Sequence, residues 1–228
     1  MRAGPDRPPR RLIWDLPTRI VHWALVLLVP FSWWTAENDM MDRHRLSGYF
    51  ILGLLVFRLL WGVVGGESAR FAGFVRGPRA AWRFVRALAT RAALPASVGH
   101  NPLGGWSVLA MLAALIGQVS LGLFAIDGDG LESGPLSHYV GYDTARLAAA
   151  AHEIVFYILI GLIALHLLAV GWHQFALRHN LIGPMITGRG DAPAGVAAPI
   201  QAPAWRAAAA LVASAALAWF VANGLRLI

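Results

Sequence analysis

Five long, nearly uncharged apolar runs constrain the fold of this chain more than any other feature. A helix that crosses the roughly 30 Å hydrocarbon core of a membrane needs about 17 to 25 apolar residues. The runs cover approximately residues 20–36, 46–64, 103–126, 148–175 and 207–225, and the second contains Arg58. Tryptophans lie near several ends, as is typical of a membrane interface: Trp14, Trp33, Trp34, Trp61, Trp106, Trp172 and Trp205. The sequence therefore predicts an all-α integral membrane protein with five transmembrane helices.

Composition excludes several classes of protein. The chain is 57% hydrophobic and only 14% charged, which excludes a soluble cytosolic enzyme. It has no cysteine, which excludes disulfides, thiolate metal sites and iron–sulfur clusters, so histidine is the natural metal or haem ligand. The first run, behind Arg10 and Arg11, could also be interpreted as a cleaved signal peptide. A polar His22 within it argues against that interpretation.

Charge alternates between successive connecting segments and predicts the orientation. The amino terminus and the segments after the second and fourth runs, counted together with Arg58 near the same end of the second run, carry fifteen arginines against four acidic residues, a net charge of +11, and the other side carries −4. Because basic segments remain in the cytoplasm, the amino terminus is expected to be cytoplasmic. The overall charge of +7 is then a topology signal, and nucleic-acid binding is not favoured.

Two segments outside the runs have recognisable patterns. Between Gly65 and Asn101, apolar residues alternate with arginines over residues 79–88, which predicts an amphipathic helix on the inner membrane surface. From Thr187 to Pro203 the chain is rich in Gly, Ala and Pro, which predicts a flexible linker before the fifth helix.

Four of the eight histidines lie on the predicted helices at matched depths. His152 and His166 are fourteen residues apart, so at about 1.5 Å and 100° per residue they share a helix face and lie roughly 21 Å apart. His44 is level with His152 at the outer end, and His22 is about as deep as His166 at the inner end. These depths predict two pairs, His44 with His152 and His22 with His166, each able to hold a b-type haem.

Other interpretations of these side chains stay open. Zinc or copper ligation is less favoured, because two-histidine sites lack a third or fourth ligand. His173 could bond a haem propionate or a quinone, or could face water. Arg58 could snorkel to the interface or pair with an inner haem propionate. His100, His138 and His179 lie outside the runs and are expected to be solvated. Glycines within the runs could let helices or a flat macrocycle approach the backbone closely: Gly48, Gly53, Gly117, Gly122 and Gly161.

A set of short motifs resembles the bacterial di-haem cytochromes b561, which share a domain with the cytochrome b subunit of nickel–iron hydrogenases. The resemblance covers about residues 12–190. The motifs are WDLPTR (14–19) with His22-Trp23, HRLSGY (44–49), FRLLWG (57–62), RGP (76–78), GHNPLGG (99–105), His152-Glu153 with His166, NLI (180–182) and MITG (185–188).

The resemblance implies a four-helix transmembrane bundle over residues 12–190 with two b haems, ligated by His22, His44, His152 and His166. We then expect a linker at 191–203 and an additional transmembrane helix at 204–228. Alanine runs in that helix suit a partner or dimer surface, although it could be a simple anchor.

The resemblance also implies electron transfer between ubiquinone or another quinone and a periplasmic or membrane redox partner, in a bacterial inner membrane. A quinone site is expected near His22, His173 and Arg58. A negatively charged outer surface favours a positively charged carrier such as a c-type cytochrome. Two alternatives are a superoxide:ubiquinone oxidoreductase and a haem-bearing anchor subunit of a dehydrogenase or hydrogenase. No catalytic residue is assigned, and whether the chain is an enzyme stays open.

Overall fold

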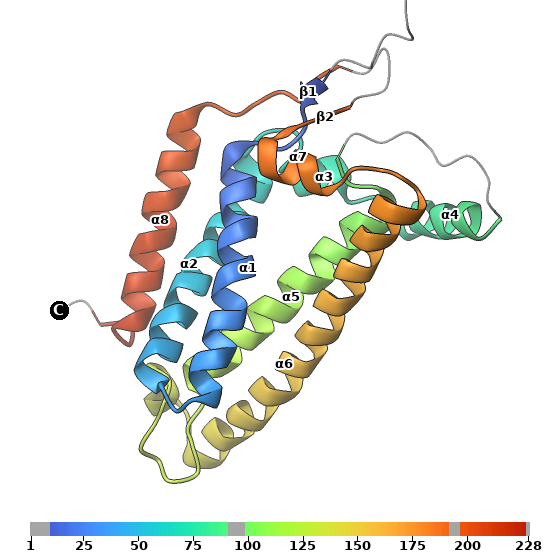
Figure 1. Cartoon of the computed structure of the whole chain (residues 1–228). Helices are drawn as coiled ribbons and strands as arrows, with labels where there is room; N and C mark the ends of the chain where they lie inside the picture. The colour runs from blue at the N-terminus through green and yellow to red at the C-terminus, as the bar shows by residue number, and fades with distance from the viewer. Residues whose placement is uncertain (1–9, 91–98, 192–196, 227–228) are drawn as a thin grey trace, which may run out of the picture.

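Five long helices dominate the computed structural model, which describes residues 10–90, 99–191 and 197–226 (Figure 1). Each is long and apolar enough to cross a membrane, and large apolar side chains such as Leu27 and Leu168 are exposed on them, as expected where lipid is the solvent. The prediction of an all-α membrane protein is therefore confirmed. The helices are α1 (Leu16–Glu37), α2 (Met41–Val64), α5 (Pro102–Phe124), α6 (Tyr142–Gly171) and α8 (Ala204–Ala222).

Local sequence signals set where the helices begin. Asp15 caps α1, accepting a hydrogen bond from the Thr18 amide at 2.8 Å, and Asn101 caps α5 in the same way through Gly104 at 2.7 Å. A proline follows each cap, where its missing N–H costs nothing. α2 and α6 begin five and six residues before their predicted apolar runs, because charged side chains can face water while the backbone stays helical. His44 thus lies inside α2.

The helices run alternately up and down and pack in neighbouring pairs (Figure 1). α1 packs against α2, α5 against α6, and α2 also contacts α5 and α8. One buried cluster includes Ile51 and Leu55 of α2, Leu112 and Leu115 of α5, and Leu159 of α6. The end that holds the α1–α2 turn and the loop 125–141 is called the acidic end here, and the opposite end is called the basic end.

Short elements cover the basic end (Figure 1). The predicted amphipathic helix is present as α4 (Pro78–Ala89), with Phe84 buried and Trp82 69% exposed. Trp106 of α5 donates to the Arg76 carbonyl at 2.9 Å, so α4 is tied to the bundle. The other elements here are β1 (Arg10–Leu12), α3 (Phe71–Phe74), a π-helical turn η2 (Trp172–Ala176), α7 (Ile182–Thr187) and β2 (Arg189–Asp191), and a 3₁₀ turn η1 (Ser137–Tyr139) lies at the acidic end.

The predicted flexible linker is partly ordered, which corrects the sequence interpretation. β2, within Thr187–Pro203, pairs antiparallel with β1, and Ile200 and Glu67 exchange hydrogen bonds at 2.9 and 3.0 Å. Residues 192–196 lie outside the described residues. Composition did not indicate this order, because the partners, β1 and Glu67, lie more than 130 residues away in the sequence.

α8 packs along α2 through a stripe of small residues. Ala210, Ser214 and Ala218 recur every fourth position and are buried, and a Cβ at Gly53 of α2 would lie 3.6 Å from that of Ala218. Tyr139 also donates to the Gly224 carbonyl at 3.0 Å just beyond α8. The small-residue face that suited a partner or dimer is therefore used against α2 of the same chain.

Candidate functional site

His44 of α2 and His152 of α6 face each other at the acidic end. Their ring centroids are 6.1 Å apart and their planes are 85° apart. Imidazole–metal bonds are about 2 Å long, so rings on opposite sides of one metal have centroids roughly 6 Å apart. The pair that the depth argument predicted is therefore brought together at a spacing that fits one metal between two imidazoles.

Hydrogen bonds hold both rings in one orientation. Nδ1 of His44 lies 2.9 Å from the Ser32 carbonyl and 3.2 Å from its hydroxyl. Nδ1 of His152 lies 2.8 Å from the Gln118 carbonyl. A carbonyl can only accept, so each Nδ1 donates and each Nε2 carries the ring's lone pair, which in His152 accepts from the Gln118 side-chain amide. Histidines that bind metals typically donate their other ring N–H in this way.

Helix α5 is shaped to receive His152. A Cβ at Gly122 would lie 2.9 Å from Cε1 of His152, so only glycine leaves room for the ring. The Gln118 side-chain amide lies 3.0 Å from Nε2 of His152, and its Oε1 is buried without a hydrogen-bond partner among the described residues. The sequence analysis missed Gln118 and Ser32. The available signal was the isolated amide of Gln118 within an apolar run.

His22 of α1 and His166 of α6 lie at the basic end, within electrostatic range of each other. Nδ1 of His22 is buried without a hydrogen-bond partner among the residues that the structure describes. Trp23, next to His22, donates to the Met185 carbonyl at 3.1 Å. α7 therefore fixes the part of α1 that carries His22.

Arg58 is a buried cation at the basic end. It is 7% exposed, its guanidinium lies 4.8 Å from the Phe71 ring centroid, and it donates to the Ala69 carbonyl at 3.2 Å. The snorkelling alternative is therefore wrong, because α3 encloses the side chain.

His100 is not the solvated loop residue that the sequence analysis expected. Its ring packs between Trp14 and Phe74, with centroid distances of 4.6 and 4.4 Å, and Nδ1 is buried without a hydrogen-bond partner in the described part of the chain. Burial, followed by the charge of Arg58 and then His166, lowers the pKa of His100 to about 3. His100 is therefore a neutral side chain beside the basic-end histidines.

The remaining histidines are closer to water. His138 and His179 are exposed, as expected. His173 is half-buried in η2, and its described ring contact is with His179 at 5.9 Å. A π-helical turn often marks a functional position, but the described contacts do not join His173 to His22 or Arg58.

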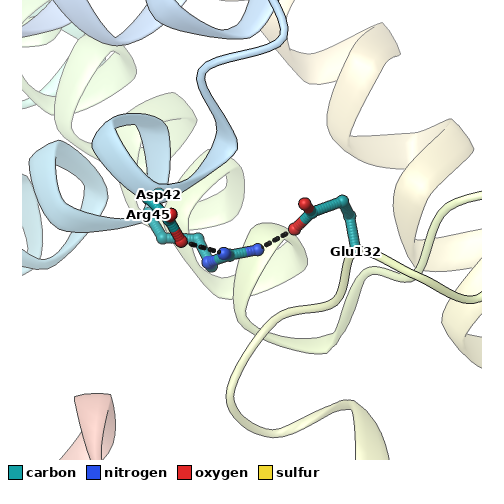
Figure 2. Close-up of polar contacts among 3 residues, drawn as sticks. All are labelled: Asp42, Arg45 and Glu132. Carbon is teal, nitrogen blue, oxygen red and sulfur yellow. Dashed lines mark hydrogen bonds and ion pairs between the residues drawn. The ribbon is translucent and has the colours of Figure 1, made fainter.

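Figure 2 shows an ion-pair network around Arg45, the residue that follows His44 in the sequence. Arg45 pairs with Asp42 at 2.5 Å and also with Glu132. The pairs attach the loop 125–141 to the start of α2 and compensate the positive charge next to His44. The surface at this end therefore stays acidic.

His44 and His152 fit a metal ion whose other ligands come from a bound cofactor rather than from the protein. Among the described residues, no group of three or more His, Cys, Asp or Glu side chains could hold a metal ion. Two opposed imidazoles without further protein ligands suit a haem iron better than a bare ion.

A comparison with protein-family models agrees with this chemistry. The model for prokaryotic cytochrome b561 matches residues 13–188, which includes α1, α2, α5 and α6 and leaves out α8. The chain matches no curated protein and no solved structure.

Proposed function

The chain belongs to the prokaryotic cytochrome b561 family and is thus a bacterial membrane protein of haem-mediated electron transfer, and we propose that two b haems connect a quinone with a redox partner. The opposed rings of His44 and His152 carry this proposal, with both Nδ1 atoms on carbonyls. The four-helix domain is assigned to residues 12–190, the linker to 191–203 and the additional helix to 204–228.

Four histidines are proposed as haem ligands. His44 and His152 would hold one haem, and His22 and His166 the other. Bound haem supplies reversible one-electron chemistry. The chain supplies the imidazoles, an apolar surrounding and fixed charges.

Helix α6 connects the two sites. It is one continuous helix from Tyr142 to Gly171, so His152 and His166 are separated by about 21 Å of helical rise, 1.5 Å per residue. A ligand near each end of one membrane-spanning helix supports electron transfer across the membrane.

A quinone site is proposed at the basic end, near His22, Arg58 and His173. Arg58 offers a buried positive charge, and Oε1 of Gln174, next to His173, is buried without a partner among the described residues. Quinone reduction consumes protons, and half-buried His173 is placed to pass them from water. A His173→Ala variant that keeps the wild-type rate of quinone-linked haem reduction would exclude His173 from this role.

The partner is proposed to dock at the acidic end, on the periplasmic side, with the amino terminus in the cytoplasm. Arg45 is paired with Asp42 and Glu132, so the acidic surface favours a positively charged carrier such as a c-type cytochrome. The same network compensates Arg45 and leaves Arg43 as the exposed arginine beside His44 without a described ion pair, which reduces the positive charge that could attract superoxide. Stopped-flow mixing tests this preference: haem reduction by superoxide above background would favour the superoxide oxidase alternative.

The first test is haem content. We expect two b haems per chain from the pyridine haemochrome of the purified protein, and a reduced-minus-oxidised spectrum of b type. His152→Ala should lower the count to one, whereas His138→Ala, an exposed histidine at the same end, should leave two. Well-folded protein without haem, or a count that His152→Ala leaves unchanged, would contradict the ligand assignment. Copurification with a large catalytic subunit would instead favour the anchor-subunit alternative.

A further inference from the structure

The two proposed ligand pairs differ in the hydrogen bonds that hold their imidazoles. Nδ1 donates to a carbonyl in both His44 and His152, at 2.9 and 2.8 Å. At the basic end, neither Nδ1 of His22 nor the ring of His166 makes a hydrogen bond to a residue that the structure describes. Donation from the distal N–H makes an imidazole a stronger electron donor to its metal. The acidic-end ligands therefore favour oxidised iron more than the basic-end ligands.

Neighbouring helices build the acidic-end hydrogen bonds. Ser32 of α1 supplies the carbonyl for His44, and the same oxygen also accepts from the Thr35 hydroxyl at 2.8 Å. The Gln118 carbonyl on α5 reaches His152 because Gly122 leaves room for the ring. Each acceptor is thus a backbone atom of a packed helix.

The charged side chains near the two sites favour the same order of reduction potentials as the hydrogen bonds. Buried Arg58, within electrostatic range of His100 at the basic end, favours the reduced iron, which carries less positive charge, and solvent screens it weakly. Buried Asp15 lies within electrostatic range of Arg58 and offsets part of its charge, but it accepts hydrogen bonds from Thr18 and Trp61 and forms no ion pair with Arg58 in the described structure. At the acidic end, exposed Glu153 follows His152 directly and favours oxidised iron, although water screens it more than it screens Arg58.

We infer that the His44–His152 site has the lower reduction potential and the His22–His166 site the higher one. The inference rests on the proposed two-haem function and adds a direction to it. With a haem held by each histidine pair, this order would favour passage of one electron from the acidic end to the basic end, so that the first site would be oxidised and the second reduced with no bond broken and no proton moved. Electrons would enter from a one-electron donor at the acidic end and leave to quinone at the basic end.

The experiment is a redox titration of the full-length haem-loaded protein, followed by visible absorbance. The wild type should show two one-electron components. Gly122→Ala should crowd His152, weaken its hydrogen bond and raise only the lower component. A tenfold change in the reduction equilibrium corresponds to about 59 mV for one electron, and we expect a change of this order. Gly117→Ala is the matched control on α5, because its Cβ would meet Val155 at an ordinary 3.8 Å.

Arg58 variants test the other site. Arg58→Gln removes the buried charge and should lower only the higher component, whereas Arg58→Lys keeps the charge and should leave that component near its wild-type value. If Gly122→Ala expels a haem, Ser32→Ala replaces it. The Ser32 carbonyl still accepts from Nδ1 of His44, and only the longer contact with the hydroxyl at 3.2 Å is lost, so the lower component should rise by a smaller amount.

The outcomes separate this inference from the proposed function. A raised upper component in Gly122→Ala or Ser32→Ala, or a lowered lower component in Arg58→Gln, would reverse the assigned order and overturn the inference. Two components of equal potential would overturn it as well. Fewer than two haems in the wild type would instead contradict the proposed function itself.

Discussion

Asp15 provides a quantitative test of how the basic end is held together. Its carboxylate is 4% exposed, and its two oxygens have different partners. Oδ1 caps α1 through the Thr18 amide at 2.8 Å, and Oδ2 accepts from Nε1 of Trp61 at 3.0 Å. Trp61 is itself 2% exposed, so water cannot replace the carboxylate.

The cost of Asp15→Ala has two parts. Loss of an N-cap costs about 1 kcal/mol, and a buried donor without a partner, here Nε1 of Trp61, costs about 1–3 kcal/mol. We therefore expect a loss of about 2–4 kcal/mol in the free energy of unfolding. Asp15→Asn keeps an oxygen for the cap but directs an N–H₂ group at Trp61, so it should lose only the second part. The expected order of stability is wild type, Asp15→Asn, Asp15→Ala.

The assay is equilibrium unfolding of the haem-loaded protein in mixed detergent micelles, monitored by circular dichroism and Soret absorbance. A double-mutant cycle with Trp61→Phe isolates the Asp15–Trp61 hydrogen bond, because both partners are then absent. A coupling energy near zero, or equal losses for Asp15→Asn and Asp15→Ala, would refute the reasoning. Since His22 lies seven residues into α1 after the cap, Asp15→Ala should also release the basic-end haem first.

Three further outcomes are expected. Glu132→Gln leaves Arg45 one carboxylate, so it should cost less than about 1 kcal/mol and the loss should shrink at high salt; a larger loss in thermal melts would contradict this. His100 has a pKa of about 3 when folded and about 6.5 when unfolded. Between these two pKa values the unfolded chain binds more protons than the folded chain, so stability falls as the pH drops below 6.5. His100→Phe should make stability less dependent on pH in thermal melts at several pH values. An unchanged pH dependence would be evidence against a buried neutral imidazole. Tyr139→Phe removes the bond to Gly224 and should cost about 0.5–1.5 kcal/mol, with faster hydrogen exchange at the end of α8.

The fold was largely predictable because membrane helices depend on length and apolarity. All five runs became helices, and only their ends differed. Hydropathy does not predict where α2 and α6 begin, because charged residues such as Asp42 and Asp143 are compatible with a helix that extends into water.

The site was predictable in part. Matched depths on two predicted helices pair His44 with His152 from the sequence alone, and the structure brings these rings together. The acceptors of their Nδ1 protons were not predictable, because a backbone carbonyl has no sequence signature. The burial of His100 was missed for another reason: it depends on Trp14 and Phe74, which come from two distant segments.

The short two-stranded sheet of β1 and β2 holds the two ends of the family-matched region together. That region covers residues 13–188, and its first residue donates its amide to the carbonyl of its last, Ile13 to Gly188, at 2.7 Å. A unit whose two ends touch can be extended, fused or circularly permuted there without moving an interior helix. α8 is such an addition. It follows this junction in the chain and packs along α2, while the three helices that carry the proposed ligand histidines, α1, α2 and α6, stay within the family-matched region.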